Sequence, residues 1–246
     1  MYFHLKRILL AILPQNFILK NEFYFRKIYA FFLTGNSVCC NICNQHFSRF
    51  ISNDSGEKIC PRCGSLARHR RLWIILHNEL TIHKQDAILD FSPSRIIMKK
   101  LQKSYPNYLT SDFQENKLVD RQIDITAIEE KANAFHWIIC YHILEHIEDD
   151  LKAMQEVYRV LKKGGTAIIQ TPFKEGSIYE NSAIRTKEDR LAHFGQEDHV
   201  RIYSADGLKE RLQSVGFEVR ILEYTEEVNN VNGFKTNEVV ILAKKR

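Results

Sequence analysis

Short apolar runs alternate with amphipathic stretches along the last two thirds of the 246-residue chain. The apolar runs lie at 87–91, 108–110, 119–125 (the weakest), 137–141, 166–171, 217–222 and 238–243. Between them, apolar residues recur at helical spacing in stretches such as 95–104, 149–163 and 205–215. Strands that alternate with helices need crossover connections, which favour a mostly parallel sheet buried on both faces. We therefore predict an α/β fold.

The last two apolar runs have no helical pattern between them. Residues 223–237 are polar and contain an Asn232-Gly233 pair, which is typical of a tight turn. The two runs are therefore expected to form an antiparallel hairpin. Together the seven runs predict a Rossmann-like, seven-stranded, mostly parallel sheet with an antiparallel last strand.

The stretch 149–163 gives the best defined helix. Its expected apolar face consists of Leu151, Met154, Val157, Tyr158 and Leu161. Acidic residues at the start of the stretch and lysines at its end suit the helix dipole. Gly164 follows as a left-handed cap, so the helix is expected to reach residue 163.

The chain begins with an apolar, basic segment, residues 1–36, which is expected to form helices that pack on the rest of the protein. Its most apolar stretch, 8–19, has only 12 residues and contains Pro14. A membrane span needs about 20 apolar residues, and no small-residue cleavage site follows the Lys6-Arg7 pair. We therefore predict no transmembrane segment and a cytoplasmic location.

The cysteines are clustered, with five of the six between residues 39 and 63. Two Cys-x-x-Cys pairs, Cys40 with Cys43 and Cys60 with Cys63, are separated by 16 residues, which is typical of a zinc ribbon. Cys39 could replace Cys40 as a ligand, but Cys40 gives the better spacing. Two disulfides are the alternative, and a reducing cytosol disfavours them.

Zinc prefers four cysteine or histidine ligands in a tetrahedron, and each Cys-x-x-Cys pair supplies two thiolates. Four thiolates fill the coordination sphere, so the predicted zinc is structural. A turn at 53–56 indicates that the chain between the two pairs forms a hairpin. We assign residues 37–66 to the zinc ribbon, with a linker helix at 65–80.

Charge is unevenly distributed along the chain. Residues 1–84 hold 12 Lys and Arg against 4 Asp and Glu, a balance of +8, and the remainder hold 23 against 26, a balance of −3. The basic N-terminal part, residues 1–84, can attract nucleic acid, anionic lipid or an acidic substrate. Arg70 belongs to a basic cluster near the start of the linker helix, where cations are unfavourable unless an anion binds. Either Arg70 contacts substrate or this cluster pairs with acidic residues of the body.

The body from about residue 87 to residue 245 resembles a class I S-adenosylmethionine-dependent methyltransferase. The resemblance is carried by the segments 88–93, 109–113, 124–125, 138–147 and 159–167. The cysteine pairs, together with 65–73 and 194–201, resemble a subgroup of these enzymes that bears a zinc ribbon. We therefore expect a methyltransferase domain over 67–246.

The resemblance implies a set of site residues. The cofactor S-adenosylmethionine would be bound by Asp90, Phe91, Ser92, Pro93, Asp112, Phe113, Asp124, Ile125 and Tyr141. Among these, Asp112 would accept hydrogen bonds from the ribose hydroxyls. The alternative role for Asp112, at the end of a strand, is to cap the start of a helix. Asp124 would accept from the adenine amino group.

The family's Gly-x-Gly loop is replaced by residues 91–94, which contain no glycine, and glycine is scarce in the whole chain, at 10 of 246 residues. This cofactor carries no phosphate, so the loop need only pass close to its methionine part.

His142 and His199 are the candidate general bases, and Asp198 and Arg201 are candidates for substrate binding.

The predicted function is transfer of a methyl group from S-adenosylmethionine to a small molecule, a saccharide or RNA. The alternative is a zinc-ribbon protein that binds nucleic acid and carries an inert methyltransferase-like domain.

Overall fold

The computed structural model describes residues 11, 14–53, 56–225 and 229–246. The chain forms two compact units. The first is built from residues 1–82, 94–97 and 225–237, and the second from residues 83–93, 98–224 and 238–246. The first unit therefore takes its sequence from three separate stretches of the chain.

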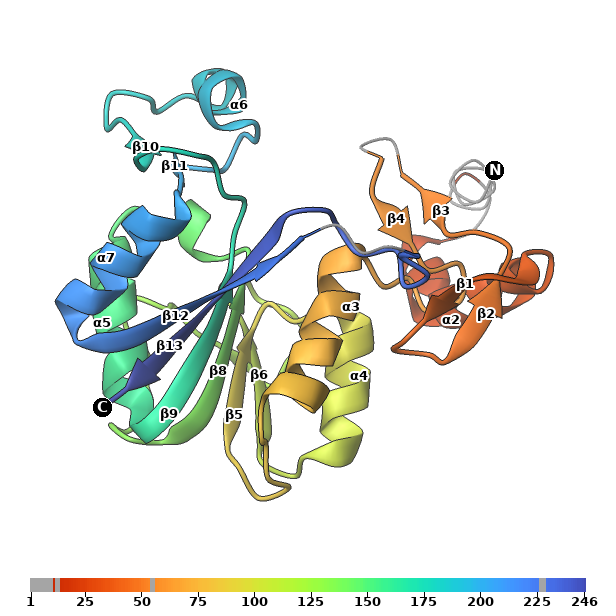
Figure 1. Ribbon diagram of the computed structural model, residues 1–246, viewed down its shortest axis with the longest axis horizontal. Helices are drawn as coiled ribbons and strands as arrows, with labels where there is room; N and C mark the ends of the chain where they lie inside the picture. Colours follow the sequence, from red (N-terminus) through yellow and green to blue (C-terminus); the bar gives the residue numbers. More distant parts are fainter. Residues whose placement is uncertain (1–10, 12–13, 54–55, 226–228) are drawn as a thin grey trace. The chain divides into compact units, whose positions relative to one another are not determined.

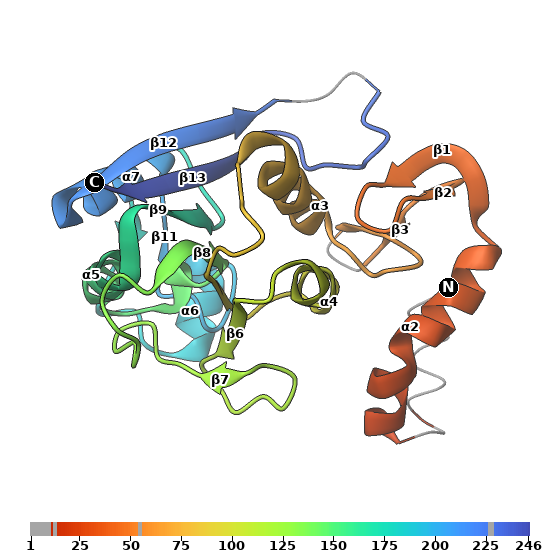
Figure 2. The same ribbon diagram turned by 90° about the horizontal axis from the view of Figure 1, so that it is seen from below.

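The second unit contains a seven-stranded sheet with the strand order β12-β13-β9-β8-β5-β6-β7 (Figures 1 and 2). Its strands are β5 (Ile88–Phe91), β6 (Tyr108–Asp112), β7 (Arg121–Gln122), β8 (Phe135–Tyr141), β9 (Leu161–Gln170), β12 (Phe217–Tyr224) and β13 (Glu238–Lys245). Strands β5 to β9 run parallel, and β13 is antiparallel to both of its neighbours. The predicted α/β fold, its mostly parallel sheet and its antiparallel last strand are confirmed.

Helices α5 (Asp150–Val160) and α7 (Ala205–Val215) lie together on one face of this sheet (Figure 1). Their apolar residues, such as Val157 and Leu212, join the strand residues in one hydrophobic core. Helix α7 has the bounds expected from the sequence. Helix α4 (Arg95–Ser104) also matches its predicted stretch.

The chain between β9 and α7 adds elements that the apolar pattern did not predict. They are β10 (Tyr179–Glu180), α6 (Lys187–Phe194) and β11 (Arg201–Ile202), and β10 pairs antiparallel with β11. These elements are short and mostly exposed, so no periodic apolar face marks them in the sequence. A short 3-10 helix, η2 (Leu144–His146), follows β8.

Helix α5 is shorter than predicted. It ends at Val160, because Leu161 is extended and pairs with Phe135 of β8. The backbone N–H of Ala134 donates to the carbonyl of Val160, so strand pairing takes the chain out of the helix. Leu161 therefore opens β9, and Gly164, with φ +79°, lies within that strand rather than capping the helix. Leu151, expected on the apolar face, is 44% exposed.

The first unit contains five of the six cysteines. Its elements are α2 (Gln15–Phe31), β1 (Thr34–Cys40), β2 (Gln45–Phe47), β3 (Ile51–Ser52), β4 (Lys58–Ile59), α3 (Ala67–Ile74) and the π-helix η1 (Ile75–Glu79). Strands β1 and β2 form one antiparallel hairpin, and β3 and β4 form another. The second hairpin lies between the two cysteine pairs, as the sequence predicted.

Part of the predicted N-terminal segment, residues 1–10, lies outside the described residues, as do residues 54–55 of the predicted turn. Within the described ranges, no helix has both the length and the apolar character that a membrane span requires.

Candidate functional site

The carboxyl ends of three neighbouring strands in the second unit meet at one edge of the sheet. Phe91, the last residue of β5, pairs in parallel with Ser111 of β6 and Cys140 of β8. The residues that follow these positions therefore lie at the same edge. Ligands of open α/β sheets bind outside the carboxyl ends of the strands, so this edge is the candidate cofactor site.

Ser92 turns the chain at the end of β5. Its φ is +46°, a left-handed conformation that glycine adopts more readily than other residues. Its backbone N–H donates to the carbonyl of Ser111 at 2.7 Å, and its hydroxyl donates to Asp112 Oδ1 at 3.2 Å. The loop without glycine thus makes a tight turn, with Ser92 in a conformation suited to glycine.

Asp112 ends β6 with its carboxylate held from two sides. Besides the Ser92 hydroxyl on Oδ1, the side-chain amide of Asn116 donates to Oδ2 at 2.9 Å. The side chain is only half-buried, so the carboxylate remains accessible. An acidic residue at this place in a dinucleotide-binding fold accepts from ribose hydroxyls, and the orientation here suits the same task.

The remaining predicted cofactor residues divide into interior and exposed positions. Phe91 and Ile125 are buried, whereas Phe113 is 64% exposed, and Pro93 and Tyr141 are intermediate. Asp124 is exposed, and its Oδ1 accepts from both the backbone N–H and the hydroxyl of Thr126, each at 2.8 Å.

Asp90 lies inside the second unit rather than on its surface. Its carboxylate accepts a hydrogen bond from the Tyr108 hydroxyl at 2.7 Å. Burial raises the pKa of Asp90 to about 7, and the bond from Tyr108 only partly opposes this. Asp90 therefore joins β5 to β6 from within and influences the loop only indirectly.

The loop after β8 brings a histidine and a buried carboxylate together. His142 has φ +56°, and its Nδ1 lies 3.0 Å from Glu145 Oε1. Glu145 is 1% exposed; although burial opposes ionisation, the bond to His142 holds the pKa of Glu145 below its ordinary value. A carboxylate on Nδ1 fixes the proton there, which leaves Nε2 of His142 free to accept one. This pair resembles the base-and-orienter arrangement of acid–base catalysis.

His199 is also buried next to this loop. Burial lowers the pKa of His199, so its ring is neutral near pH 7. The rings of His199 and His146 meet edge to face with centroids 4.7 Å apart. One possible ligand atom from each of Glu145, His146 and His199 lies within 4.8 Å of the others, so this group has the donors to hold a cation.

Asp198 and Arg201, both predicted to bind substrate, have different surroundings. Asp198 is exposed, and its carboxylate lies 3.3 Å from His146 Nδ1. Arg201 is buried and donates to the carbonyls of Leu144, Ile147 and Glu148. Its guanidinium thus fixes the loop after β8, and few of its donors remain for a ligand.

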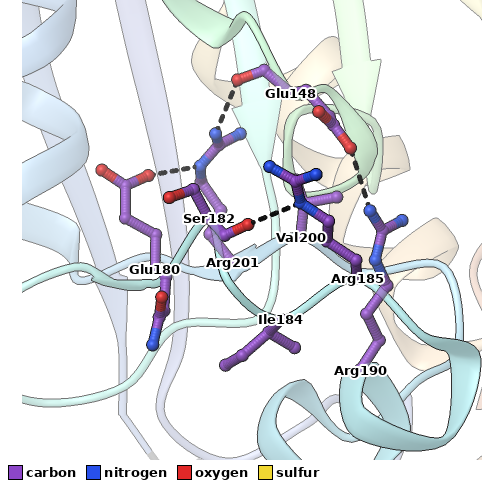
Figure 3. A pocket seen from close by; sticks show the side chains of 9 residues that line it. Glu148, Glu180, Ser182, Ile184, Arg185, Arg190, Val200 and Arg201 are labelled. Atoms are coloured by element: carbon purple, nitrogen blue, oxygen red, sulfur yellow. Dashed lines mark hydrogen bonds and ion pairs between the residues drawn. The ribbon is translucent and has the colours of Figure 1, made fainter.

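A polar pocket adjoins this loop (Figure 3). It has a volume of about 530 Å³ and is lined by Glu148, Glu180, Asn181, Ser182, Ile184, Arg185, Arg190, Val200 and Arg201. Of the predicted substrate residues, only Arg201 lines it. The sequence did not single out its other residues; all of them except Glu148 lie between β9 and α7, in the stretch without periodic apolar residues. The sequence analysis did not predict that Glu145 is the partner of His142, although Glu145 follows His142 at a spacing of three residues.

The four predicted zinc ligands lie together in the first unit. The sulfurs of Cys40 and Cys63 are 3.6 Å apart, those of Cys43 and Cys60 are 3.7 Å apart, and all four lie within 4.8 Å of one another. Zn–S bonds of about 2.3 Å in a tetrahedron place sulfurs about 3.8 Å apart. The geometry therefore fits a zinc ion, and Cys39 is outside the cluster.

Arg70, another predicted substrate residue, is a core residue of the first unit. It is 0% exposed and donates to the carbonyls of Lys58, Ser65, Asn232 and Gly233. Its guanidinium also lies 4.2 Å from the centre of the Phe50 ring. Its position in the interior disfavours contact with a substrate, and its hydrogen bonds hold the turn at Asn232 and Gly233 within the first unit.

Solved structures provide comparisons for the fold. One similar structure is a putative methyltransferase in a complex with the Haloferax volcanii Trm112 methyltransferase activator. The TM-score is 0.54 and the identity 10%, and the match covers 73% of this chain and 90% of the matched chain. The 1,6-didemethyltoxoflavin-N1-methyltransferase of Burkholderia thailandensis has a TM-score of 0.52, 16% identity, and coverage of 73% and 78%. The YcgJ protein of Bacillus subtilis has a TM-score of 0.52, 13% identity, and coverage of 72% and 99%.

The family comparison covers most of the second unit and part of the first. A search of curated proteins found no match. A family model described as a methyltransferase domain matches residues 58–221, which is more than half of the chain. With this match and the sheet described above, the chain belongs to the class I S-adenosylmethionine-dependent methyltransferases.

Proposed function

We propose that this protein transfers a methyl group from S-adenosylmethionine to a small polar acceptor, such as a saccharide. The observation that carries the proposal is the link between Ser92 and Asp112 at the carboxyl edge of β5 and β6. It positions an accessible carboxylate beside a tight turn, where the family binds its cofactor. The family match favours this function over the alternative of an inert domain that binds nucleic acid.

The cofactor, when bound, supplies a methyl group on a positively charged sulfur. Asp112 would accept from the ribose hydroxyls through the part of its carboxylate that Ser92 and Asn116 leave free. Asp124 would accept from the adenine amino group, with Ile125 packed below the ring. Tyr141, at the end of β8, would close the site beside the methionine part and exclude water there.

His142 is the proposed proton acceptor. Its Nδ1 is held by Glu145, so its Nε2 can take a proton from the hydroxyl or amine of the acceptor as the new bond to carbon forms. Glu145 is a positioning residue that also stabilises the charged ring. His199 is the second candidate, because its buried ring is neutral near pH 7.

Calorimetry with S-adenosylhomocysteine, the demethylated product, tests the cofactor site. Hydrogen bonds to a charged group contribute about 1.5–3 kcal/mol, so Asp112→Asn should weaken binding by roughly 10- to 100-fold. Asp206→Asn, an exposed change in the first turn of α7, is the matched control and should leave binding unchanged. Absence of binding by the natural protein at millimolar product would rule out the proposal.

We also propose that Cys40, Cys43, Cys60 and Cys63 bind one structural zinc ion. The proposal is supported by the sulfur spacing and by the ligand type. Four thiolates leave no open coordination position, so the ion would hold β1, β2 and the second cysteine turn together without taking part in methyl transfer.

A further inference from the structure

We propose that the pocket in Figure 3 binds an anionic group, a carboxylate or a phosphate, of the methyl acceptor. This inference rests on the proposed function and narrows its acceptor to small molecules that carry such a group. All nine lining residues belong to the second unit.

The size and lining of the pocket indicate a small polar ligand. Its volume of about 530 Å³ falls within the range of small-molecule sites. Only Ile184 and Val200 among its lining residues are apolar. An apolar ligand would cover the remaining polar groups without giving them hydrogen-bond partners, which is unfavourable.

One side of the pocket is already neutralised. Arg201 Nε donates to Glu180 Oε2 at 2.8 Å, and Glu180 also accepts from Arg211. Burial opposes ionisation of Glu180, but the hydrogen bonds from Arg211 and Arg201 hold its pKa below the ordinary value. Arg211 also donates to Asp150 at 2.5 Å, so two arginines balance two carboxylates. This side is fixed and offers no net charge to a ligand.

The other side of the pocket has cationic donors in excess. Arg185 uses Nε to donate to the carbonyl of Ser182 at 3.1 Å, and its terminal nitrogens have no partner among the described residues. Arg190 pairs with Glu148 at 2.9 Å, but the Glu148 side chain is 78% exposed, so water weakens this pair. Arg190 Nε is buried and has no partner within the described part of the chain.

The arrangement of these two arginines suits an oxyanion. Figure 3 shows both guanidinium groups pointing toward the end of the pocket where Glu148 lies. Two planar donor forks on the same side match the geometry of a carboxylate or a phosphate. An anion bound there would compete with Glu148 for Arg190 and would supply a partner for Arg185.

The pocket wall is tied to the proposed proton acceptor. The backbone N–H of Val200, a lining residue, donates to the carbonyl of Glu145 at 2.9 Å, and Arg201 donates to the carbonyl of Glu148. Glu145 in turn holds His142. An acceptor anchored by its anion in the pocket would therefore lie beside the loop that carries His142.

Side-chain NMR of protein labelled with ¹⁵N-arginine tests the proposal directly. Three matched probes, glucose 6-phosphate, glucuronate and glucose, are titrated at constant ionic strength without any cofactor. We expect saturable shifts of the Nε signals of Arg185 and Arg190 with at least one charged sugar and none with glucose. The tighter of the two charged sugars identifies phosphate or carboxylate as the preferred group.

Variants give the second arm of the experiment. Arg185→Gln combined with Arg190→Gln should weaken binding of the charged sugar at least tenfold, whereas Arg220→Gln, an exposed arginine of β12, should not. Absence of saturable shifts with both charged sugars, or equal binding by the double variant, would overturn the inference. Binding of S-adenosylhomocysteine by the double variant should be unchanged, so failure of the pocket is distinguished from failure of the cofactor site.

Discussion

Replacement of Asp90 by asparagine should favour the folded protein more at pH 8 than at pH 5. The carboxyl group of Asp90 is buried and has the Tyr108 hydroxyl as its hydrogen-bond donor. Asparagine keeps an oxygen that can accept the same bond, and it removes the ionisation. The difference between the two proteins therefore reports on the charge.

The magnitude follows from the pKa. Burial raises the pKa of Asp90 from its ordinary value of 3.8 to about 7. The unfolded chain releases this proton near pH 3.8 and the folded chain near pH 7, so folding stability falls as the pH rises through that interval. Each pH unit corresponds to about 1.4 kcal/mol. Between pH 5 and pH 8 the advantage of Asp90→Asn should grow by about 3 kcal/mol, most of it gained below pH 7.

Urea unfolding followed by circular dichroism at pH 5, 6, 7 and 8 measures this difference. Asp206→Asn, at an exposed position, is the control and should show no change in its effect across the same range. Titration of the ¹³C signal of the Asp90 carboxyl gives an independent value. An asparagine advantage that is the same at pH 5 and pH 8, together with a carboxyl signal that titrates near pH 4, would refute the reasoning.

Two further predictions concern the zinc ligands and the cofactor loop. Metal analysis should find about one zinc per chain. Cys43→Ser should lower the zinc content and the melting temperature, whereas Cys39→Ser should alter neither. A natural protein without zinc would contradict the assignment. Ser92→Gly should be more stable than Ser92→Ala by about 1 kcal/mol, because both lack the hydroxyl but only alanine resists φ +46°. Equal unfolding midpoints in urea for these two variants would show that the turn is not held in a left-handed conformation.

The apolar pattern predicted the sheet because a buried parallel strand needs a continuous apolar run. The runs at 87–91 and 137–141 correspond to the central strands β5 and β8, and the hairpin of the last two runs is antiparallel as expected. The four clustered cysteines could be predicted because each Cys-x-x-Cys pair forms within one local turn. Where tertiary contacts competed with local pattern, the prediction was wrong, as at the end of α5, where pairing with β8 removed Leu161 from the helix.

In the candidate site too, some features could be predicted from the sequence and others depend on tertiary contacts. The sequence located His142, Asp112 and the loop without glycine, because strand ends can be recognised from the apolar runs. It could not show that Ser92 and Asp112 are hydrogen-bonded, since they come from different strands. Nor could it distinguish Arg201, which donates to backbone carbonyls and to Glu180, from Arg185, whose terminal nitrogens have no partner among the described residues.

The sequence by itself determined which segments form the strands of the seven-stranded sheet, which cysteines can share a metal, and which edge of the sheet carries the polar loops. These properties depend on residue types at short spacings, where local geometry is nearly fixed. The tertiary structure alone decided which charged side chains are available to a ligand. Arg70 and Arg201 have the same chemistry as Arg185. Only burial and hydrogen bonds from distant parts of the chain separate these two structural arginines from the arginine that is proposed to bind a ligand.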